Sequence, residues 1–334
     1  KYKIAVIGSG PTGLSAADLL NQAGHNVTVF EQDDRVGGLL RYGIPDFKLT
    51  KSIIDRRIEL MYEEGVRFQT STTVGKDITA EKLLSEYDAV LLAVGAMKPR
   101  DLNVEGRELK GVYFALEFLK QQNQIVGGAQ IPSAERIDAK NKKVLVIGGG
   151  DTGSDCVGTS IRHKAASVTQ IEIMPKPPVN RTENNPWPYW PNVLRTSSSH
   201  HEGCERRWSL TTKRIFGENG VVTGVEVVQV EWVSENGRMS MREIPGTEEI
   251  IQADLVLLSM GFVHPVHEGL LNDLSVEYDA RGNVSIGDDH STSKAKVFAA
   301  GDAATGASLV VRAIKSGRDA AENIDRYLKT IESL

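Results

Sequence analysis

The sequence predicts an α/β fold made of two similar parallel-sheet domains, the second inserted into the first. A short apolar strand, a glycine-rich turn and a helical pattern occur in this order twice, beginning at Ile4 and at Lys143. Each copy is closed later in the chain by an apolar strand that ends in glycine, at Gly95 and at Gly261. Duplication of a whole βαβ unit is stronger evidence for this architecture than either copy alone.

The first copy places a G-x-G-x-x-G turn between a strand and a helix. Residues 4–7 are apolar throughout, as in a buried parallel strand, and Gly8-Ser9-Gly10-Pro11-Thr12-Gly13 follows directly. In such a turn the first glycine bends the chain, the second lets a pyrophosphate approach, and the third lets helix and strand pack closely. The phosphates would bind the free N–H groups at the helix N-terminus. Glu31 follows the next strand, where a carboxylate can accept hydrogen bonds from ribose hydroxyls.

The stretch after Glu31 is a second candidate for ligand contact. Residues 37–45 contain paired glycines, which let the backbone pass close to a bound molecule, and a proline that stiffens the loop. On physical grounds alone, an ordinary surface loop is an equal alternative. A helix over 51–63 and strands over 66–70 and 87–95 follow, and the polar stretch 99–106 suits a crossing between domains.

The second copy repeats this plan. An apolar strand over 143–147 leads into Gly148-Gly149-Gly150-Asp151-Thr152-Gly153, and a helical pattern follows. The strand over 168–173 carries Glu172 near its end, as Glu31 follows the corresponding strand of the first copy. We therefore predict a second dinucleotide site built on the same principle.

A β-rich insertion lies between the second copy and its closing strand. Residues 208–216, 221–233 and 238–244 are strand-like, and Asn219-Gly220 and Asn236-Gly237 are typical hairpin turns. The preceding run Pro186-Trp187-Pro188-Tyr189-Trp190-Pro191 is irregular. We expect its tryptophans to cover an apolar edge, with ligand contact as the lesser alternative.

The C-terminal part supplies a third apolar strand over 296–300, followed by Gly301 and Asp302. A carboxylate at a buried strand end is costly unless it is hydrogen-bonded, so Asp302 needs a partner. A plain helix cap is the alternative explanation for this acid. A helix is predicted from Leu309 to about residue 329, with apolar residues near one face.

Composition limits the possible partners and compartments. The 334 residues, 40% hydrophobic and 25% charged, suffice for two globular domains. A net charge of −5 without a basic run argues against nucleic acid, and no apolar stretch reaches the length of a membrane span. Cys156 and Cys204 are too few and too far apart for a disulfide framework or a C-x-x-C redox pair. We therefore expect a reducing cytoplasm and no metal site.

Together these motifs resemble the small (beta) subunit of glutamate synthase, over essentially the whole chain. Residues 8–13 with Glu31, and residues 37–45, are similar to its FAD site, while 146–153 with Asp155-Cys156 are similar to its NAD(P)H turn. Arg195-Thr196-Ser197-Ser198-Ser199-His200 and the Trp-Pro-rich run separate this family from adrenodoxin reductase, thioredoxin reductase and the dihydropyrimidine dehydrogenase flavin module. Ala300-Gly301-Asp302 resembles the second FAD motif of the wider group.

The resemblance implies two Rossmann-like domains of the glutathione, thioredoxin and adrenodoxin reductase type. It places the FAD domain over 1–104 and 283–334, and the NAD(P)H domain, with its β-rich insertion, over 105–282. Asp302 would bond the flavin ribitol, and the helix after it would point at the flavin N1–C2=O edge. The expected FAD contacts are Gly8, Gly10, Pro11, Thr12, Gly13, Glu31, Gly38, Leu39, Arg41, Val74, Gly95, Gly301, Asp302, Ser308 and Leu309. The expected NAD(P)H contacts are Gly148, Gly150, Asp151, Thr152, Gly153, Glu172 and Gly261.

The resemblance also implies an electron-transfer enzyme. Electrons would pass from NAD(P)H through FAD to iron–sulfur clusters, and on to a large subunit that makes two glutamates from glutamine and 2-oxoglutarate. No general acid or base is nominated, because hydride transfer between stacked rings needs positioning above all. Family members carry a cysteine-rich cluster domain upstream, and nothing similar is found in this sequence, so we expect a truncated or naturally shortened form.

Two alternatives stay open at this point. An NADH-dependent ferredoxin:NADP oxidoreductase or an electron-bifurcating flavoprotein subunit would share both domains and differ chiefly in its partner. A non-catalytic NAD(P)H-sensing scaffold would keep the fold without turnover, although intact glycines in both copies and Asp302 argue against it.

The choice of nicotinamide is expected to depend on Glu172. A carboxylate at this position accepts hydrogen bonds from both ribose hydroxyls and repels a 2′-phosphate, which favours NADH. The nearest basic groups that could serve a 2′-phosphate instead are Arg162, Lys164, Lys176 and Arg181.

Overall fold

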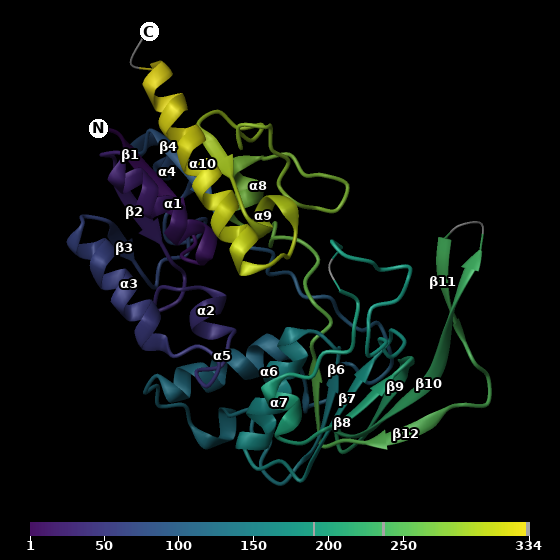
Figure 1. Ribbon diagram of the computed structural model, residues 1–334. Helices are drawn as coiled ribbons and strands as arrows, with labels where there is room; N and C mark the ends of the chain where they lie inside the picture. Colours follow the sequence, from purple (N-terminus) through teal and green to yellow (C-terminus); the bar gives the residue numbers. More distant parts are fainter. Residues whose placement is uncertain (190, 236–237, 332–334) are drawn as a thin grey trace. The chain divides into compact units, whose positions relative to one another are not determined.

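The chain folds into two compact units in the computed structural model, which describes residues 1–189, 191–235 and 238–331 (Figure 1). Unit 1 comprises Lys1–Arg100 and the chain from Phe262 onward, and unit 2 is Asp101–Gly261. The boundaries expected from sequence were 104/105 and 282/283. The return to unit 1 lies at Phe262 because residues 270–274 pack their leucines into the core of that unit.

Unit 1 contains a five-stranded parallel sheet. Its strand order is β14-β4-β1-β2-β3, so the chain starts in the centre of the sheet and later adds strands on both sides. The bounds are β1 (Lys3–Ile7), β2 (Asn26–Phe30), β3 (Arg67–Gln69), β4 (Ala89–Leu92) and β14 (Val297–Ala299). The central strands β1 and β4 and the edge strand β14 are buried and apolar over residues 4–7, 89–92 and 297–299, as is typical of parallel strands that are covered on both faces.

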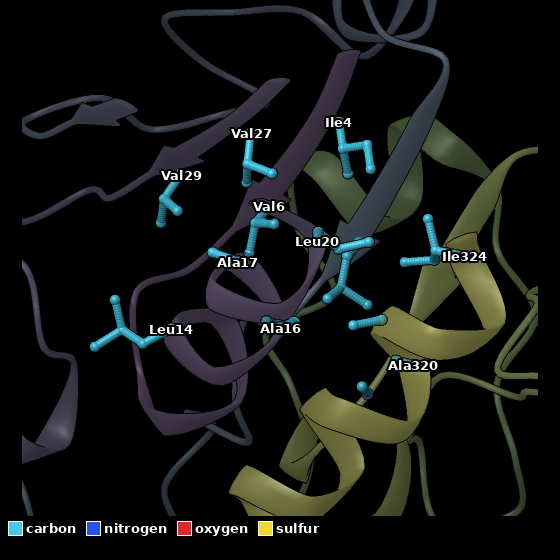
Figure 2. Close-up of a cluster of buried hydrophobic side chains, with 14 of the residues drawn as sticks. Ile4, Val6, Leu14, Ala16, Ala17, Leu20, Val27, Val29, Ala320 and Ile324 are labelled. Carbon is cyan, nitrogen blue, oxygen red and sulfur yellow. The ribbon is translucent and has the colours of Figure 1, made fainter. Parts of the chain in front are cut away.

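Helices cover both faces of this sheet. On one face, α1 (Pro11–Gln22) and α10 (Val310–Ile331) share a core in which Leu20 and Ile324 pack near Ile4 and Val6 of β1 (Figure 2). On the other face, α4 (Ala80–Glu86) and α8 (Leu270–Leu274) contribute Leu83, Leu270 and Leu274 to a second core. The remaining helices of unit 1 are α2 (Leu39–Tyr42), α3 (Lys51–Glu63) and α9 (Asp302–Thr305).

Unit 2 repeats the parallel sheet, in the order β5-β13-β6-β7-β8. The bounds are β5 (Val112–Phe114), β6 (Lys143–Ile147), β7 (Ser167–Glu172), β8 (Glu205–Trp208) and β13 (Leu255–Leu258). One face packs against α5 (Ala115–Val126) and α6 (Asp151–Arg162), whose Phe118, Leu119 and Val157 are buried. Two short elements, η1 (Ser133–Glu135) and α7 (Ser198–His201), lie in the connections.

An antiparallel sheet covers the other face of unit 2. It consists of β9 (Leu210–Glu218), β10 (Val221–Glu235), β11 (Arg238–Glu243) and β12 (Glu249–Gln252). Ile215, Val222 and Val225 of this sheet pack on Leu145 and Ile147 of β6. The insertion therefore supplies the apolar layer that helices supply on this face of many parallel sheets.

Most expected elements of the insertion are present, with two differences. Asn219 and Gly220 form the hairpin turn between β9 and β10, both with positive φ; the second expected turn, Asn236-Gly237, lies outside the described residues. The single strand expected over 208–216 is divided, because Ser209 has a φ of 55° and separates parallel β8 from antiparallel β9.

The expectation for the tryptophan-rich run is wrong at Trp187, whose side chain is 82% exposed and covers no apolar edge. Trp190 lies outside the described residues. Among the helices of the described chain, none combines the length and apolar character that crossing a membrane requires.

Candidate nucleotide-binding sites

The glycine turn of unit 1 has two glycines that the protein itself requires and one that it does not. Gly8 has a φ of +101°, and a Cβ there would clash with the Ala93 carbonyl. A Cβ at Gly13 would clash with the carbonyl of Gly8. Beside Gly10, by contrast, a Cβ would meet no protein atom within 4 Å. The space beside Gly10 is thus open to a ligand, at the N-terminus of α1.

Glu31 is fixed at the turn by several donors. Its side chain is buried and accepts hydrogen bonds from the Ser9 backbone N–H at 3.2 Å, from the Ser9 hydroxyl and from the Asp33 N–H at 2.8 Å. The Ser9 hydroxyl also accepts from the Gly37 N–H at 3.0 Å. Charge-assisted bonds of this kind orient a carboxylate firmly. Glu31 therefore stands beside the turn in one defined position.

The paired glycines after Glu31 lie against the turn. A Cβ at Gly38 would come within 2.8 Å of the Gly10 Cα, and Gly38 is the residue before α2, which begins at Leu39. Gly37 and Gly38 therefore do not lie in an ordinary surface loop, which was the alternative explanation of this stretch. Arg41 on α2 is buried, and it donates to the Val36 carbonyl at 2.9 Å and to Asp55 at 2.5 Å.

Gly301 and Asp302 are brought to the same region from the end of the chain. A Cβ at Gly301 would clash with the Thr12 hydroxyl on the first turn of α1. The Asp302 carboxylate accepts from the Ser308 hydroxyl at 2.7 Å, which is the partner that this acid was expected to need. Burial raises the pKa of Asp302, while its hydrogen bonds to Ser308 act in the opposite direction. The plain-cap alternative is not favoured, because the carboxylate is bonded to Ser308.

The remaining expected FAD contacts of unit 1 differ in their burial and in the elements that carry them. Gly95 has a φ of +71° just after β4, and Pro11 begins α1, where a proline fits well. Leu309 is 49% exposed immediately before α10. Val74 differs, since its side chain is buried in the core cluster that contains Leu83. A contact from Val74 to a ligand would therefore have to come from its backbone.

The turn of unit 2 has the same division of roles among its glycines. Gly148 has a φ of +125°, and a Cβ there would clash with the Ser259 carbonyl. A Cβ at Gly153 would clash with the Gly148 carbonyl, and a Cβ at Gly150 would meet nothing within 4 Å. Asp151 and Thr152 begin α6, and Gly261, with a φ of +81°, follows β13 as Gly95 follows β4.

The Glu172 carboxylate lies beside Gly149, the residue between Gly148 and Gly150 of this turn. A Cβ at Gly149 would overlap the Glu172 carboxylate, so the acid occupies the place beside the turn that Glu31 occupies next to Ser9. Burial raises the pKa of Glu172, and the positive charge of Arg206 and a hydrogen bond from Trp208 act against this rise. Two carboxylates in equivalent positions are what a pair of ribose-binding sites requires.

A partly buried hydrogen-bond chain, which the sequence did not predict, supports this turn. The Gln170 side-chain amide donates to the Gly148 carbonyl at 2.7 Å, and its oxygen is 2.8 Å from Nε2 of His200. His200 Nδ1 is 3.1 Å from the Ser197 hydroxyl, which is 2.5 Å from that of Ser154 on α6. One signal was present in the sequence, because a glutamine in the middle of an expected parallel strand must find hydrogen-bond partners if it is buried.

The two cysteines are not joined in a disulfide. Cys156 is buried and Cys204 is half-buried, and burial raises the pKa of the Cys204 thiol. Across the described ranges, no three His, Cys, Asp or Glu side chains are grouped so that they could hold a metal ion.

Comparison with known proteins identifies the family to which the chain belongs. The family model for pyridine nucleotide-disulphide oxidoreductases matches residues 2–317. Among solved structures, FprA of Mycobacterium tuberculosis in complex with NADPH has a TM-score of 0.78, with 20% identity over 99% of this chain and 85% of that one. At this identity the likeness concerns the fold alone.

Curated relatives narrow the class further. The glutamate synthase [NADPH] small chain of Mycobacterium tuberculosis is 49% identical over 97% of this chain, which spans about two thirds (66%) of that protein's length. The corresponding chain of Bacillus subtilis is 45% identical, with 98% of this chain and 68% of the relative covered. Glutamate synthase [NADH] of Saccharomyces cerevisiae is 46% identical over 98% of this chain and 16% of its own length. The chain belongs to the pyridine nucleotide-disulphide oxidoreductases and, among them, to the glutamate synthase small chains.

Proposed function

We propose that this chain is the part of a glutamate synthase small chain that binds FAD in unit 1 and NAD(P)H in unit 2. In this role it would accept reducing equivalents from the nicotinamide and pass them to iron–sulfur clusters held outside it. The observation that carries the proposal is the pair of glycines, Gly10 and Gly150, beside which the folded protein leaves room. Each stands at the N-terminus of a 12-residue helix, where backbone N–H groups favour a pyrophosphate.

The residues of unit 1 suit FAD. Gly10 and the first N–H groups of α1 would bind the pyrophosphate, while Glu31 would accept from the adenosine ribose. Asp302, fixed by Ser308, would accept from the ribitol, as the resemblance implies. The N-terminus of α10, a helix of 22 residues, would stabilise negative charge on the flavin ring. Bound FAD would supply a two-electron acceptor for hydride and an outlet for single electrons.

The residues of unit 2 suit a nicotinamide dinucleotide. Gly150 and the first N–H groups of α6 would bind its pyrophosphate, and Glu172 would lie beside its adenosine ribose. Gln170 and His200 would keep the Gly148 carbonyl in place, and so keep the shape of the turn. This chain would act through binding and orientation, with no acid or base of its own in the transfer step.

The names of the relatives support a proposal about partners. In a glutamate synthase, the large subunit would make glutamate from glutamine and 2-oxoglutarate, and this chain would provide the electrons. The clusters that connect the two would belong to a cysteine-rich domain or to the partner, since Cys156 and Cys204 are isolated from each other in sequence.

The two open glycines allow a reciprocal test. A methyl group fits the protein at both positions, so Gly10→Ala and Gly150→Ala should fold normally while each blocks one pyrophosphate. We expect Gly10→Ala to purify without flavin absorbance and still bind ADP-ribose. Gly150→Ala should keep its flavin but lose bleaching by NAD(P)H. Each variant serves as the control for the other.

Two outcomes would contradict the proposal. Full flavin absorbance in Gly10→Ala would mean that FAD does not bind at the first turn. A wild-type chain that binds FAD and NAD(P)H, yet is never bleached under anaerobic conditions, would be a nucleotide sensor and not an electron-transfer enzyme.

A further inference from the structure

The two nucleotide units can be compared residue by residue, because their strands have the same register. Phe30 pairs with Ile7 in unit 1, and Ile171 pairs with Ile147 in unit 2. Glu31 and Glu172 are the next residues, so the two acids occupy equivalent positions. Each stands beside the middle residue of its glycine turn.

The donors that hold the two acids differ. Glu31 is held by Ser9, the middle residue of its turn, through both backbone and hydroxyl. The middle residue in unit 2 is Gly149, which has no hydroxyl, and the Glu172 carboxylate fills the space where a side chain would begin. The side-chain donor for Glu172 is instead the indole N–H of Trp208, its direct neighbour on β8.

The adjoining strand also differs in charge. Where unit 1 has Phe68 paired with Val29, unit 2 has Arg206 paired with Gln170. The Arg206 guanidinium lies 5.0 Å from the centre of the Trp208 ring and donates to the Arg195 carbonyl at 3.0 Å. Its charge favours the ionised form of Glu172, which burial disfavours. Lys176, on the chain after β7, also lies 5.0 Å from the Trp208 ring, and Asp151 begins α6 beyond the turn.

The backbone beyond Glu172 is tied down as well. The Ile173 carbonyl accepts from the Trp232 indole at 3.1 Å, and the Met174 carbonyl accepts from the Ser209 N–H at 3.0 Å. Of the basic residues that a 2′-phosphate could recruit, Arg162 is paired with Glu202, and Arg181 donates to the Asn185 and Tyr189 carbonyls. The backbone that follows Glu172 is therefore fixed, while Arg162 and Arg181 are engaged with other groups.

We propose that Trp208 and Arg206 are positioning residues that hold Glu172 as an ionised acceptor for both ribose hydroxyls, and thereby select NADH over NADPH. The proposal rests on the nucleotide site assigned to unit 2 in the proposed function. A carboxylate in this position accepts two hydroxyl hydrogen bonds from NADH, whereas it repels a 2′-phosphate. The inference extends the role of Glu172 to two residues on the neighbouring strand: Trp208, which donates a hydrogen bond to the carboxylate, and Arg206, whose charge favours its ionised form.

The first test measures binding without any redox step. ADP-ribose and 2′-phospho-ADP-ribose are titrated into the full chain by calorimetry. Wild type should bind ADP-ribose more tightly. Trp208→Phe removes the donor and keeps a ring, and Arg206→Met removes the charge and keeps the length. Each should weaken ADP-ribose about tenfold and leave the 2′-phospho compound unchanged or tighter, so that the preference falls.

The matched control is Arg207→Met. Arg207 adjoins both positions, but it points to the opposite face of β8 and pairs with Glu249. It should leave the preference for ADP-ribose at the wild-type value. Arg206→Lys, which restores a charge, should recover part of the loss and guards against a simple folding defect.

The second readout is the pH profile of ADP-ribose binding, which a purely structural role would not shift. Because the pKa of Glu172 is raised, affinity should fall on acidification through a midpoint above that of an ordinary glutamate. Loss of Trp208 or Arg206 removes an influence that lowers this pKa, so the midpoint should move to higher pH. In Glu172→Gln, the midpoint should vanish.

The outcomes separate the two levels of the argument. Tighter wild-type binding of the 2′-phospho compound would overturn the inference and point to Lys176 and Arg206 as phosphate ligands. An unchanged preference and midpoint in both Trp208→Phe and Arg206→Met would also overturn it. If wild type binds neither compound, the nucleotide site of unit 2 fails, and the proposed function fails with it.

Discussion

At the scale of single residues, the glycine turns show how one motif serves both folding and binding. In each turn the first and third glycines are demanded by close backbone contacts, at Gly8 and Gly13 and at Gly148 and Gly153. The second glycine is not demanded by any protein atom within 4 Å. Because packing requires only the first and third glycines, the second glycine leaves space that a ligand can approach.

This distinction predicts that two neighbouring glycine substitutions differ in their effect on stability. Gly13→Ala should lower the free energy of unfolding by about 1–3 kcal/mol, because the new methyl group overlaps the Gly8 carbonyl. Gly10→Ala should leave the stability of the flavin-free chain unchanged. Urea unfolding of both variants after removal of flavin is the measurement. Equal losses in the two variants would mean that Gly10 is also a packing residue.

The turn residues and acids could be predicted from sequence because their evidence is local. Gly8, Gly10, Gly13 and Glu31 belong to one βαβ unit, whose spacing is fixed by the lengths of a strand and a helix. Arg206 could not be found in this way, because it reaches Glu172 only through the pairing of β7 with β8. That pairing depends on the whole sheet and not on any pattern around either residue.

At the scale of elements, α7 has a larger role than its four residues suggest. The N-cap Ser197 and His200 join this helix to Ser154 on α6 and to Gln170 on β7. In the sequence, the motif that contains them indicates only a family resemblance. Its physical role is to connect three elements around the nucleotide turn of unit 2, through groups that burial obliges to be hydrogen-bonded.

Removing His200 from this hydrogen-bond chain should therefore weaken both the fold and the proposed nucleotide site of unit 2. His200→Ala leaves the Gln170 side chain without one buried partner, which should cost about 1–3 kcal/mol of unfolding free energy. The freed glutamine should also hold the Gly148 carbonyl less firmly and reduce ADP-ribose affinity. The control is His201→Ala, an exposed neighbour on the same helix. Thermal unfolding and calorimetry test both effects, and matching results for the two variants would deny His200 this role.

One strand boundary could not be predicted from the sequence, for an identifiable reason. The apolar strands β1, β4, β6 and β13 were found because parallel strands covered on both faces are apolar without interruption. The division between β8 and β9 was missed, because residues 208–216 look strand-like throughout. The break is the positive φ of Ser209, which places the chain into a second sheet. Composition does not report such a change of sheet.

At the scale of the whole molecule, the duplication explains why two nucleotides can be assigned to one chain. Unit 1 and unit 2 share strand register, turn geometry and a terminal acid, but each is completed differently. Unit 1 is completed by α10 and the Asp302–Ser308 pair, and unit 2 by an antiparallel sheet. The shared part would bind the common ADP portion of both cofactors, and the added parts would serve what differs between them.

The same organisation predicts how far this chain can carry its reaction alone. With FAD bound, it should reduce a dye such as ferricyanide at the expense of NAD(P)H, since both proposed nucleotide sites lie within it. It should form no glutamate from glutamine and 2-oxoglutarate. The described residues include no group of three or more potential metal ligands, and a cluster held by cysteines needs more thiolates than Cys156 and Cys204 provide. Electrons would therefore reach a small diffusible acceptor but not a distant synthase site. The measurement is dye reduction and glutamate formation in one preparation, with the Gly150→Ala variant as the control that should lose the first. Glutamate made by this chain alone would show that the division of labour with a large subunit is wrong.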